Sequence, residues 1–278
     1  MSGVTGQLRS LLLCFTLSIS VSGCATDRTM SPAQEGEKVS FSIKLPEGLE
    51  AKPMRVMYRS AICRHVTHDA HGRRETLDGY NGFDLMLKRI KNDLYGAELY
   101  VDGGGPCRWR LSNVDLGVQY SVPTPFGVDA TPGWGGGLIV VFDSNNPQRQ
   151  ISRPIIVKDA VLNVIEDYYP LVSERFINGY AKQVSLVGVD GGDLTYTAPD
   201  ARIVYFEPVL HGDYVVRSIA PKKNVKGDFP KFYYPDGTVQ SHWRSEADFK
   251  KMQEIRRKTE AKQMKLPAAP PSVVRNIP

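Results

Sequence analysis

Three histidines at regular spacing are the first residues in this chain whose type suits metal chemistry. His65, His68 and His71 are three positions apart, and Asp69 lies among them. Imidazole and carboxylate groups are common ligands for zinc and copper. On a helix this spacing would roughly align the three rings, but the glycine that follows and the polar composition of 64–82 favour a long loop with exposed histidines. The histidines are therefore weak candidates for a metal site, and the sequence predicts no bound metal or cofactor.

Patterns that mark a catalytic nucleophile are absent from the sequence. There is no Gly-x-Ser-x-Gly elbow and no Ser-x-x-Lys pair. Asp190 and Asp193 carry oxygen atoms that suit calcium, but the stretch lacks the spaced ligands of an EF-hand loop and is typical of a turn. The glycine runs at 103–105 and 135–137 are not followed by a clear helix that would hold phosphate. The sequence therefore predicts that the chain is not an enzyme.

The first residues of the chain carry a signal for covalent modification at Cys24. A positive charge at Arg9 precedes an apolar run at 11–19, too short to span a bilayer, and small residues follow it. This order is typical of a secretory signal peptide. The ending Val-Ser-Gly-Cys resembles the lipobox of bacterial lipoproteins, which implies removal of 1–23 and diacylglycerol on Cys24. Ala25 after the cysteine implies, in the same pattern, transport to the outer membrane. An ordinary signal peptide cut near Ala25 and an uncleaved anchor are the alternatives.

The cysteine count points to an oxidising compartment. Of four cysteines, Cys14 leaves with the signal peptide and Cys24 is the lipid site, so Cys63 and Cys107 remain. An even pair in an exported protein predicts a disulfide between them. The bridge would close a loop of about 45 residues, for which loop entropy gives at most about 4 kcal/mol.

Charge is unevenly distributed along the chain. The net charge is +5, and 222–278 hold 13 Lys and Arg against 6 Asp and Glu, so the rest of the mature chain is slightly acidic. The basic segment is either a solvated helix with surface lysines or a segment that lies on anionic lipid headgroups. We expect no nucleic-acid partner.

Period-two alternation of apolar residues predicts a mainly β protein. Residues 39–45 alternate and then stop at a Pro-Glu-Gly turn, and hairpins are predicted around 91–93 and around 235–237. We expect two antiparallel β-sandwich-like domains with a C-terminal amphipathic helix. The predicted segments are a signal peptide at 1–23, a flexible tether at 24–36, a disulfide-clamped β domain at 37–122, a Pro/Gly connection at 123–137, a second β domain at 138–244, a basic helix at 245–265 and a Pro-rich tail at 266–278.

The helical signature rests on a few residues near the C-terminus. Ser245 followed by Asp248 predicts an N-cap, and Phe249, Met252 and Ile255 would lie on one face.

Two stretches around the cysteine pair resemble a group of uncharacterised proteobacterial lipoproteins. They are Met-Tyr-Arg-Ser-Ala-Ile-Cys at 57–63 and Gly-Gly-Gly-Pro-Cys-Arg-Trp-Arg-Leu-Ser-Asn-Val at 103–114. In that group a Tyr-Arg-Ser segment precedes one cysteine, and a Gly-rich turn precedes the other cysteine and a Trp-x-Leu-Ser-Asn-Val strand. The group often accompanies type VI secretion effectors, as immunity lipoproteins do. The resemblance covers only these stretches and implies a disulfide-clamped β scaffold, not a chemistry.

Together these features predict an outer-membrane lipoprotein that faces the periplasm and neutralises a secreted antibacterial effector, such as a type VI lipase. Aromatic and arginine side chains in loops are common interface residues, so Arg73, Tyr80 and Trp134 are the predicted partner contacts. For Trp134, burial in the core is the alternative.

Two other functions fit the sequence. One is a structural or assembly lipoprotein of an envelope complex. The other is a metal-binding or hydrolytic envelope protein, which requires a cleft with converging histidines and carboxylates.

Overall fold

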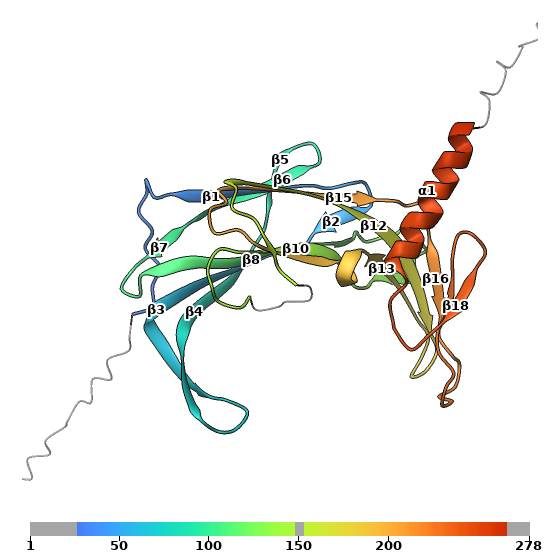
Figure 1. The fold of residues 1–278 in the computed structure, drawn as a ribbon, viewed down its shortest axis with the longest axis horizontal. Coiled ribbons are helices and arrows are strands. Elements are labelled where there is room, and N and C mark those ends of the chain that lie inside the picture. Colours follow the sequence, from blue (N-terminus) through green and yellow to red (C-terminus); the bar gives the residue numbers. More distant parts are fainter. Residues whose placement is uncertain (1–26, 148–152, 266–278) are drawn as a thin grey trace, which may run out of the picture.

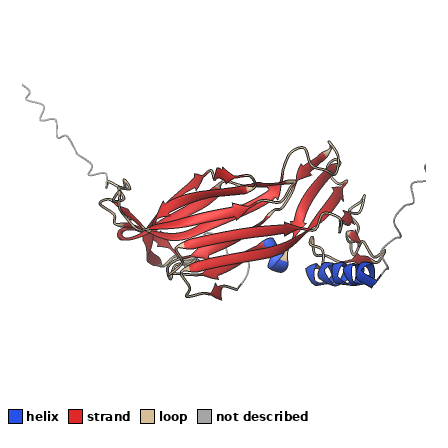
Figure 2. Ribbon diagram, turned by 90° about the horizontal axis from the view of Figure 1, so that it is seen from above, coloured by secondary structure: helices blue, strands red, loops and turns tan. Residues whose placement is uncertain are grey.

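The fold is mainly β, with two packed sheets and a helix near the C-terminus, as predicted (Figures 1 and 2). The computed structural model describes residues 27–147 and 153–265. The predicted signal peptide at 1–23, the lipid site Cys24 and the predicted tail at 266–278 lie outside the described residues. Within the described ranges, no helix is long and apolar enough to cross a bilayer.

The larger sheet has ten strands in the described part of the chain. Its strands, in spatial order, are β18 (Val239–Ser241), β17 (Lys231–Tyr233), β16 (Val216–Ile219), β12 (Val161–Arg175), β15 (Ile203–Leu210), β1 (Lys38–Lys44), β6 (Leu94–Tyr100) and β5 (Lys88–Lys91), with β13 (Ala181–Val187) beside β12 and β9 (Ala130–Pro132) beside β13. The first half of β12 pairs with β15, and its second half lies between β13 and β16. This long strand therefore joins two regions of the sheet.

The smaller sheet has eight strands among the described residues. They are β11 (Ile155–Ile156), β14 (Asp193–Thr197), β10 (Gly136–Val141), β8 (Trp109–Tyr120), β3 (Met54–His68) and β4 (Arg74–Leu85), in spatial order, with β2 (Leu49–Ala51) and β7 (Asp102–Gly104) also beside β8. A short 3₁₀ helix, η1 (Val189–Gly192), leads into β14.

The strand pairing differs from the antiparallel expectation, because both sheets are mixed. β1 pairs antiparallel with β6 and parallel with β15, and β10 pairs antiparallel with β8 and parallel with β14. Both sheets contain strands from 37–122 and from 138–244, so a division into two separate β domains does not match the sheets. Alternation of residue types marks a strand but not its partner, and parallel partners are joined by crossovers far apart in sequence.

One apolar core fills the space between the sheets. Phe41 and Phe206 of the larger sheet and Trp109 and Leu116 of the smaller sheet are all buried in it. Every second side chain of β1 is buried, as the alternation predicts. Each large apolar side chain removed from water in this way stabilises the fold by about 1.5–3 kcal/mol.

The helix α1 (Phe249–Lys265) covers a second, smaller core on the far half of the larger sheet. Met252 and Ile255 are buried there, against Phe232 of β17 and its neighbours. The predicted helix is confirmed, but its cap is different: Asp248 Oδ1 accepts the backbone N–H of Lys251 at 3.1 Å. Asp248 therefore caps the helix, and the segment around Ser245 belongs to the loop before it.

Hydrogen bonds hold part of the segment predicted as a flexible tether on the sandwich. Trp109 Nε1 donates to the carbonyl oxygen of Arg28 at 3.0 Å, and the N–H of Ser31 donates to the carbonyl oxygen of Gly103 at 2.9 Å. Gly104 has φ 60°, and a β-carbon there would collide with the carbonyl oxygen of Ser31. The Gly-rich turn therefore lets the backbone of 27–31 approach it closely. The amino-acid composition alone does not indicate this contact.

The segment 64–82, predicted as a long loop, is most of a β-hairpin. β3 continues to His68, β4 starts at Arg74, and Asp69 holds the turn by accepting the backbone N–H groups of His71 and Arg73. Figure 1 shows this hairpin projecting beyond the rest of the sheet. Because both faces of its outer part are exposed, no apolar alternation marks it as a strand.

Candidate functional site

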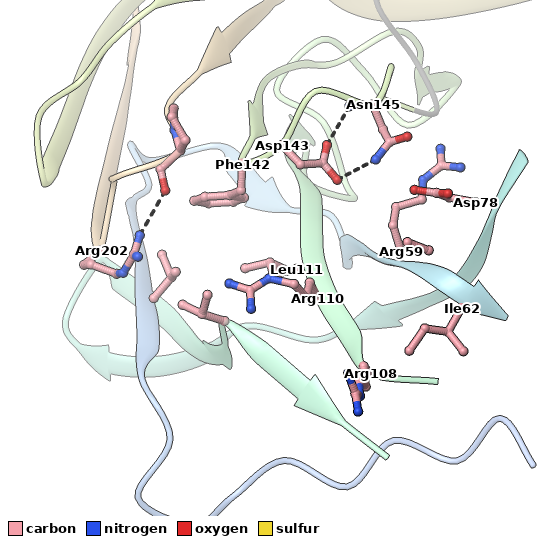
Figure 3. A pocket seen from close by; sticks show the side chains of 14 residues that line it. Arg59, Ile62, Asp78, Arg108, Arg110, Leu111, Phe142, Asp143, Asn145 and Arg202 are labelled. Carbon is pink, nitrogen blue, oxygen red and sulfur yellow. Dashed lines mark hydrogen bonds between the residues drawn. The ribbon is translucent and has the colours of Figure 1, made fainter. Parts of the chain in front are cut away.

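A pocket of about 360 Å³ opens at the end of the sandwich where β1 begins and β10 ends. Four arginines from different parts of the chain line it, with an apolar floor between them (Figure 3). The charged side chains of the lining and one apolar neighbour are Arg59, Arg108, Arg110, Arg202, Asp78, Asp143 and Ile62. Parallel pairing of β1 with β15 brings Arg202 to the same end as Arg59 and Arg110, which lie opposite each other on β3 and β8.

A bulge in β3 and the disulfide form one wall of this pocket. Between Ser60 and His65 the bulge breaks the register of β3 against β4. It turns Cys63 toward Cys107, and the two form the predicted disulfide with their Cα atoms 5.3 Å apart. Ser60 Oγ donates to the carbonyl oxygen of Cys107 and accepts the N–H of Cys63. Because Ile62 and Arg108 are the sequence neighbours of the two cysteines, the bridge fixes both pocket residues.

On one side of the pocket, hydrogen bonds hold the Arg202 side chain in place. Its Nε donates to Glu37 Oε1, and its Nη1 donates to the carbonyl oxygens of Pro199 and Ala201 at 3.1 and 3.0 Å. The hydrogen bond from Arg202 is the main cause that lowers the pKa of the Glu37 carboxyl, and the nearby charge of Arg110 lowers it further. Arg202 therefore forms a fixed wall of the pocket.

On the opposite side, the two aspartates are occupied by neighbours. Asp143 accepts hydrogen bonds from the backbone and side-chain amides of Asn145 at 2.9 and 2.8 Å, and Asp78 pairs with Arg64 at 3.6 Å. Arg59 Nη2 donates to the carbonyl oxygen of Asn146 at 3.3 Å. Its Nε is buried without a hydrogen-bond partner among the described residues, which is a costly state for a charged donor.

Arg108 and Arg110 give the pocket its excess of positive charge. Neither guanidinium group makes a hydrogen bond or an ion pair within the described part of the chain, although the charge of Arg110 acts on the nearby Glu37 carboxyl. Figure 3 shows Arg110 extending between Arg202 on one side and Arg59 on the other. Arg108 holds a left-handed backbone conformation, φ 47°, which is uncommon for a residue other than glycine. Guanidinium groups with free donors, beside apolar side chains, are suited to bind a carboxylate or phosphate.

A second hollow lies beside the start of α1, away from the arginine pocket. An open groove of about 760 Å³ runs between η1 and the segment 240–250, and a small apolar hollow lined by Trp134 adjoins it. Trp243 lines the groove and is 75% exposed, and Trp134 is 60% exposed. The backbone of Trp134 is fixed, because its N–H donates to Ser185 Oγ and its carbonyl oxygen accepts the N–H of Leu186. Both indoles are therefore large exposed apolar groups, and the one at Trp134 projects from a backbone segment that is held by hydrogen bonds.

The three predicted partner contacts are all exposed but do not form one surface. Trp134 points outward instead of into the core. Arg73 lies just before β4 and Tyr80 lies on it, in the hairpin with β3. There Arg73 pairs with Asp69 at 2.8 Å, and Tyr80 packs against the edge of His65. The structure thus separates Trp134 from the other two residues.

The histidines proposed as weak metal candidates do not converge. His65 and His68 lie on β3 at odd spacing, which directs them to opposite faces of the strand, and His71 is in the turn. No group of three or more His, Cys, Asp or Glu residues in the described ranges is placed to hold a metal ion. Asp190 lies in a tight turn within η1, with φ 46°, as the sequence predicts.

The pocket arginines and Trp243 were not among the predicted site residues. A sequence signal for three of them exists, because Arg59 lies inside the Tyr-Arg-Ser segment and Arg108 and Arg110 flank the tryptophan after Cys107. Arg202 has no such signal, since it joins the pocket only through the pairing of β15 with β1.

Comparisons of this chain with protein-family models, with curated proteins and with solved structures find no match.

Proposed function

We propose that this chain is an outer-membrane lipoprotein that faces the periplasm and neutralises a secreted antibacterial effector by binding it, with a type VI lipase as the expected class of effector. In this proposal the protein binds and does not turn over a substrate. Its membrane attachment rests on the lipobox resemblance at Cys24, and its link to an effector rests on the resemblance of 57–63 and 103–114 to immunity lipoproteins.

The observation that carries the binding part is the pair of exposed tryptophans at the groove beside α1. Tryptophan is enriched among interface residues that dominate binding energy, because a large rigid ring loses little entropy when it is covered. Trp134 and Trp243 are 60% and 75% exposed and lie at adjoining hollows. The groove beside the tryptophans is also lined by polar and charged side chains, as is the rim of a protein interface. Gln240, Glu246 and Lys250 are among them.

Deletion of the gene tests the cellular part of the proposal. A strain that lacks this chain but retains its type VI apparatus should be poisoned by sister cells that deliver the effector encoded beside the gene. Expression of the exported protein should restore survival. Survival of the deletion strain under attack by a proven active effector would remove the immunity function and favour the assembly lipoprotein.

The lipid anchor has its own test. Cys24→Ser should leave an unacylated protein that no longer fractionates with the outer membrane, because the side chain that receives diacylglycerol is gone. A Cys24→Ser protein that is still processed and acylated in that membrane would contradict the lipobox assignment.

A further inference from the structure

The arginine pocket lies next to the point where the N-terminal segment enters the sandwich. The carbonyl oxygen of Asp27 is 3.5 Å from Cys107 Sγ, and Arg108, the next residue, lines the pocket. Arg28 is held by the indole of Trp109, which precedes Arg110. The first described residues and the pocket therefore share one end of the molecule, remote from α1 in Figure 1.

This location restricts how the protein sits on a membrane, if the lipid is attached at Cys24 as proposed above. An extended chain spans at most about 3.6 Å per residue, so the three residues from Cys24 to Asp27 cover no more than about 11 Å. The polar headgroup layer of one leaflet is several ångströms thick. Because 27–31 is hydrogen-bonded to the sandwich and leaves no long tether, attachment at Cys24 would hold the pocket end near the headgroups.

We propose that the arginine pocket binds the phosphate group of an anionic phospholipid in the membrane that carries the anchor. Arg108 and Arg110 offer free guanidinium donors, and Arg59 offers a buried Nε with no partner among the described residues. Guanidinium forks match phosphate oxygens in pairs. The proposal rests on acylation at Cys24, because that attachment is what selects a lipid over other anions.

Apolar side chains at the pocket rim fit a headgroup with its glycerol. Ile62 lines the pocket and is 56% exposed, and Val66 farther along the same strand is 48% exposed. Such side chains lose exposed apolar area when they enter the interface between headgroups and acyl chains. A volume of about 360 Å³ accommodates a phosphate with part of its glycerol.

Vesicle binding by the unacylated full mature chain tests the proposal. The Cys24→Ser chain, exported through an ordinary signal peptide so that the disulfide forms, is mixed with vesicles of phosphatidylcholine, with or without phosphatidylglycerol. Binding should require phosphatidylglycerol and weaken as salt is added. The variant R108G/R110A should bind at least tenfold more weakly, since each basic residue at an anionic surface contributes about 1 kcal/mol. Glycine at 108 suits the left-handed backbone there.

A charge-matched control separates the pocket from general electrostatics. R175A/R217A removes the same charge from exposed positions on β12 and β16, in the half of the larger sheet that α1 covers, and should bind as the parent does. Equal weakening in both variants, or no binding of the parent to phosphatidylglycerol vesicles, would overturn the proposal. Circular dichroism and thermal unfolding confirm that each variant is folded.

Two soluble probes distinguish the source of the anion. Inorganic phosphate should compete only weakly, and a synthetic peptide of glutamate residues should not displace the chain from vesicles. Tight binding of either probe with no vesicle binding would overturn the lipid assignment in favour of a free phosphate or an acidic protein segment. Mass spectrometry of the native protein reports acylation at Cys24 separately, so failure of the anchor is distinguishable from failure of the pocket.

Discussion

The carbonyl oxygen of Cys63 occupies the place that a β-carbon on Gly79 would fill. Gly79 lies on β4 directly opposite Ser60, where β3 begins the bulge that turns Cys63 toward Cys107. Absence of a side chain at 79 is therefore a condition for the disulfide and for the pocket wall formed by Ile62 and Arg108.

Gly79→Ala should destabilise the fold by about 1–3 kcal/mol, because backbone atoms in a clamped bulge have little room to move. Urea unfolding measures this change. Gly212→Ala is the matched control, since no atom lies within 4 Å of a β-carbon there, and it should change stability by only a few tenths of a kcal/mol. Similar stability of the two variants would contradict the described packing around Cys63.

Replacement of both bridged cysteines by alanine should lower the free energy of unfolding by about 2–4 kcal/mol, because the unfolded chain regains the freedom of the loop between them. Urea unfolding of the oxidised parent and the C63A/C107A variant gives this difference, and mass spectrometry of non-reduced peptides should show the 63–107 link. Two free thiols in protein taken from the periplasm would contradict the bridge.

Arg256 links α1 to the larger sheet and should stabilise the attachment of the helix. Its Nη2 pairs with Asp167 at 2.9 Å and its Nε donates to Tyr169 Oη at 3.0 Å, while Asp167 also contacts His211 Nε2 at 2.7 Å. Arg256→Met should cost about 1–2 kcal/mol and speed amide exchange in α1, since it leaves half-buried partners unpaired.

Arg257→Met is the control for that change. Arg257 is exposed, and its Nε donates to the carbonyl oxygen of Gln253 in its own helix. Equal exchange rates in the two variants would show that the contacts of Arg256 do not hold the helix.

Glu166 should make stability depend on pH. This residue shares the inward face of β12 with Val164 and Tyr168, and burial, followed by the charges of Asp167 and Asp190, raises its pKa from 4.5 to about 7. The folded chain therefore binds this proton more tightly than the unfolded chain, and the associated stability is complete below pH 4.5 and lost as the pH rises to about 7.

Glu166→Gln should therefore be more stable than the parent above pH 7 by about 1–2 kcal/mol, after allowance for partial exposure, and nearly equal to it below pH 4.5. Unfolding curves across this range provide the comparison. The exposed carboxylate of Glu47 offers the control, and E47Q should keep the pH dependence of the parent. A parent whose stability does not fall across this range would contradict the assignment.

Local sequence patterns predicted the positions of strands and turns better than they predicted which strands pair. The alternation in β1, the turn at Pro235-Asp236-Gly237 and the pairing of Cys63 with Cys107 each follow from residue type and spacing, and the structure confirms them. The outer part of the β3–β4 hairpin, within 64–82, was wrongly predicted as a loop, because neither of its faces is buried and the apolar period is missing. The arginine pocket could not be predicted either, because Arg202 joins Arg110 in its lining only through the parallel pairing of strands that are far apart in sequence.

Trp134 shows where sequence alone leaves two outcomes open. Flanking glycines are compatible with an exposed ring or with one folded into the core, and neighbouring residues do not decide between them. In the structure, hydrogen bonds to Ser185 and Leu186 fix the backbone and leave the ring outside.

A titration measures whether this chain inhibits the effector by direct binding. Purified effector from the adjacent gene is assayed while the mature protein is added in steps, and the mixture is analysed by size exclusion. We expect a stable complex and loss of effector activity that is complete at a fixed stoichiometry, without consumption of either protein. W134A/W243A should weaken binding by at least tenfold. Tryptophans that dominate an interface contribute about 2 kcal/mol or more each, and about 1.4 kcal/mol corresponds to a tenfold change in affinity. Y180A, which truncates another exposed aromatic residue, should bind as the parent does. Effector activity that stays unchanged at micromolar protein, with no complex, would contradict inhibition by direct binding.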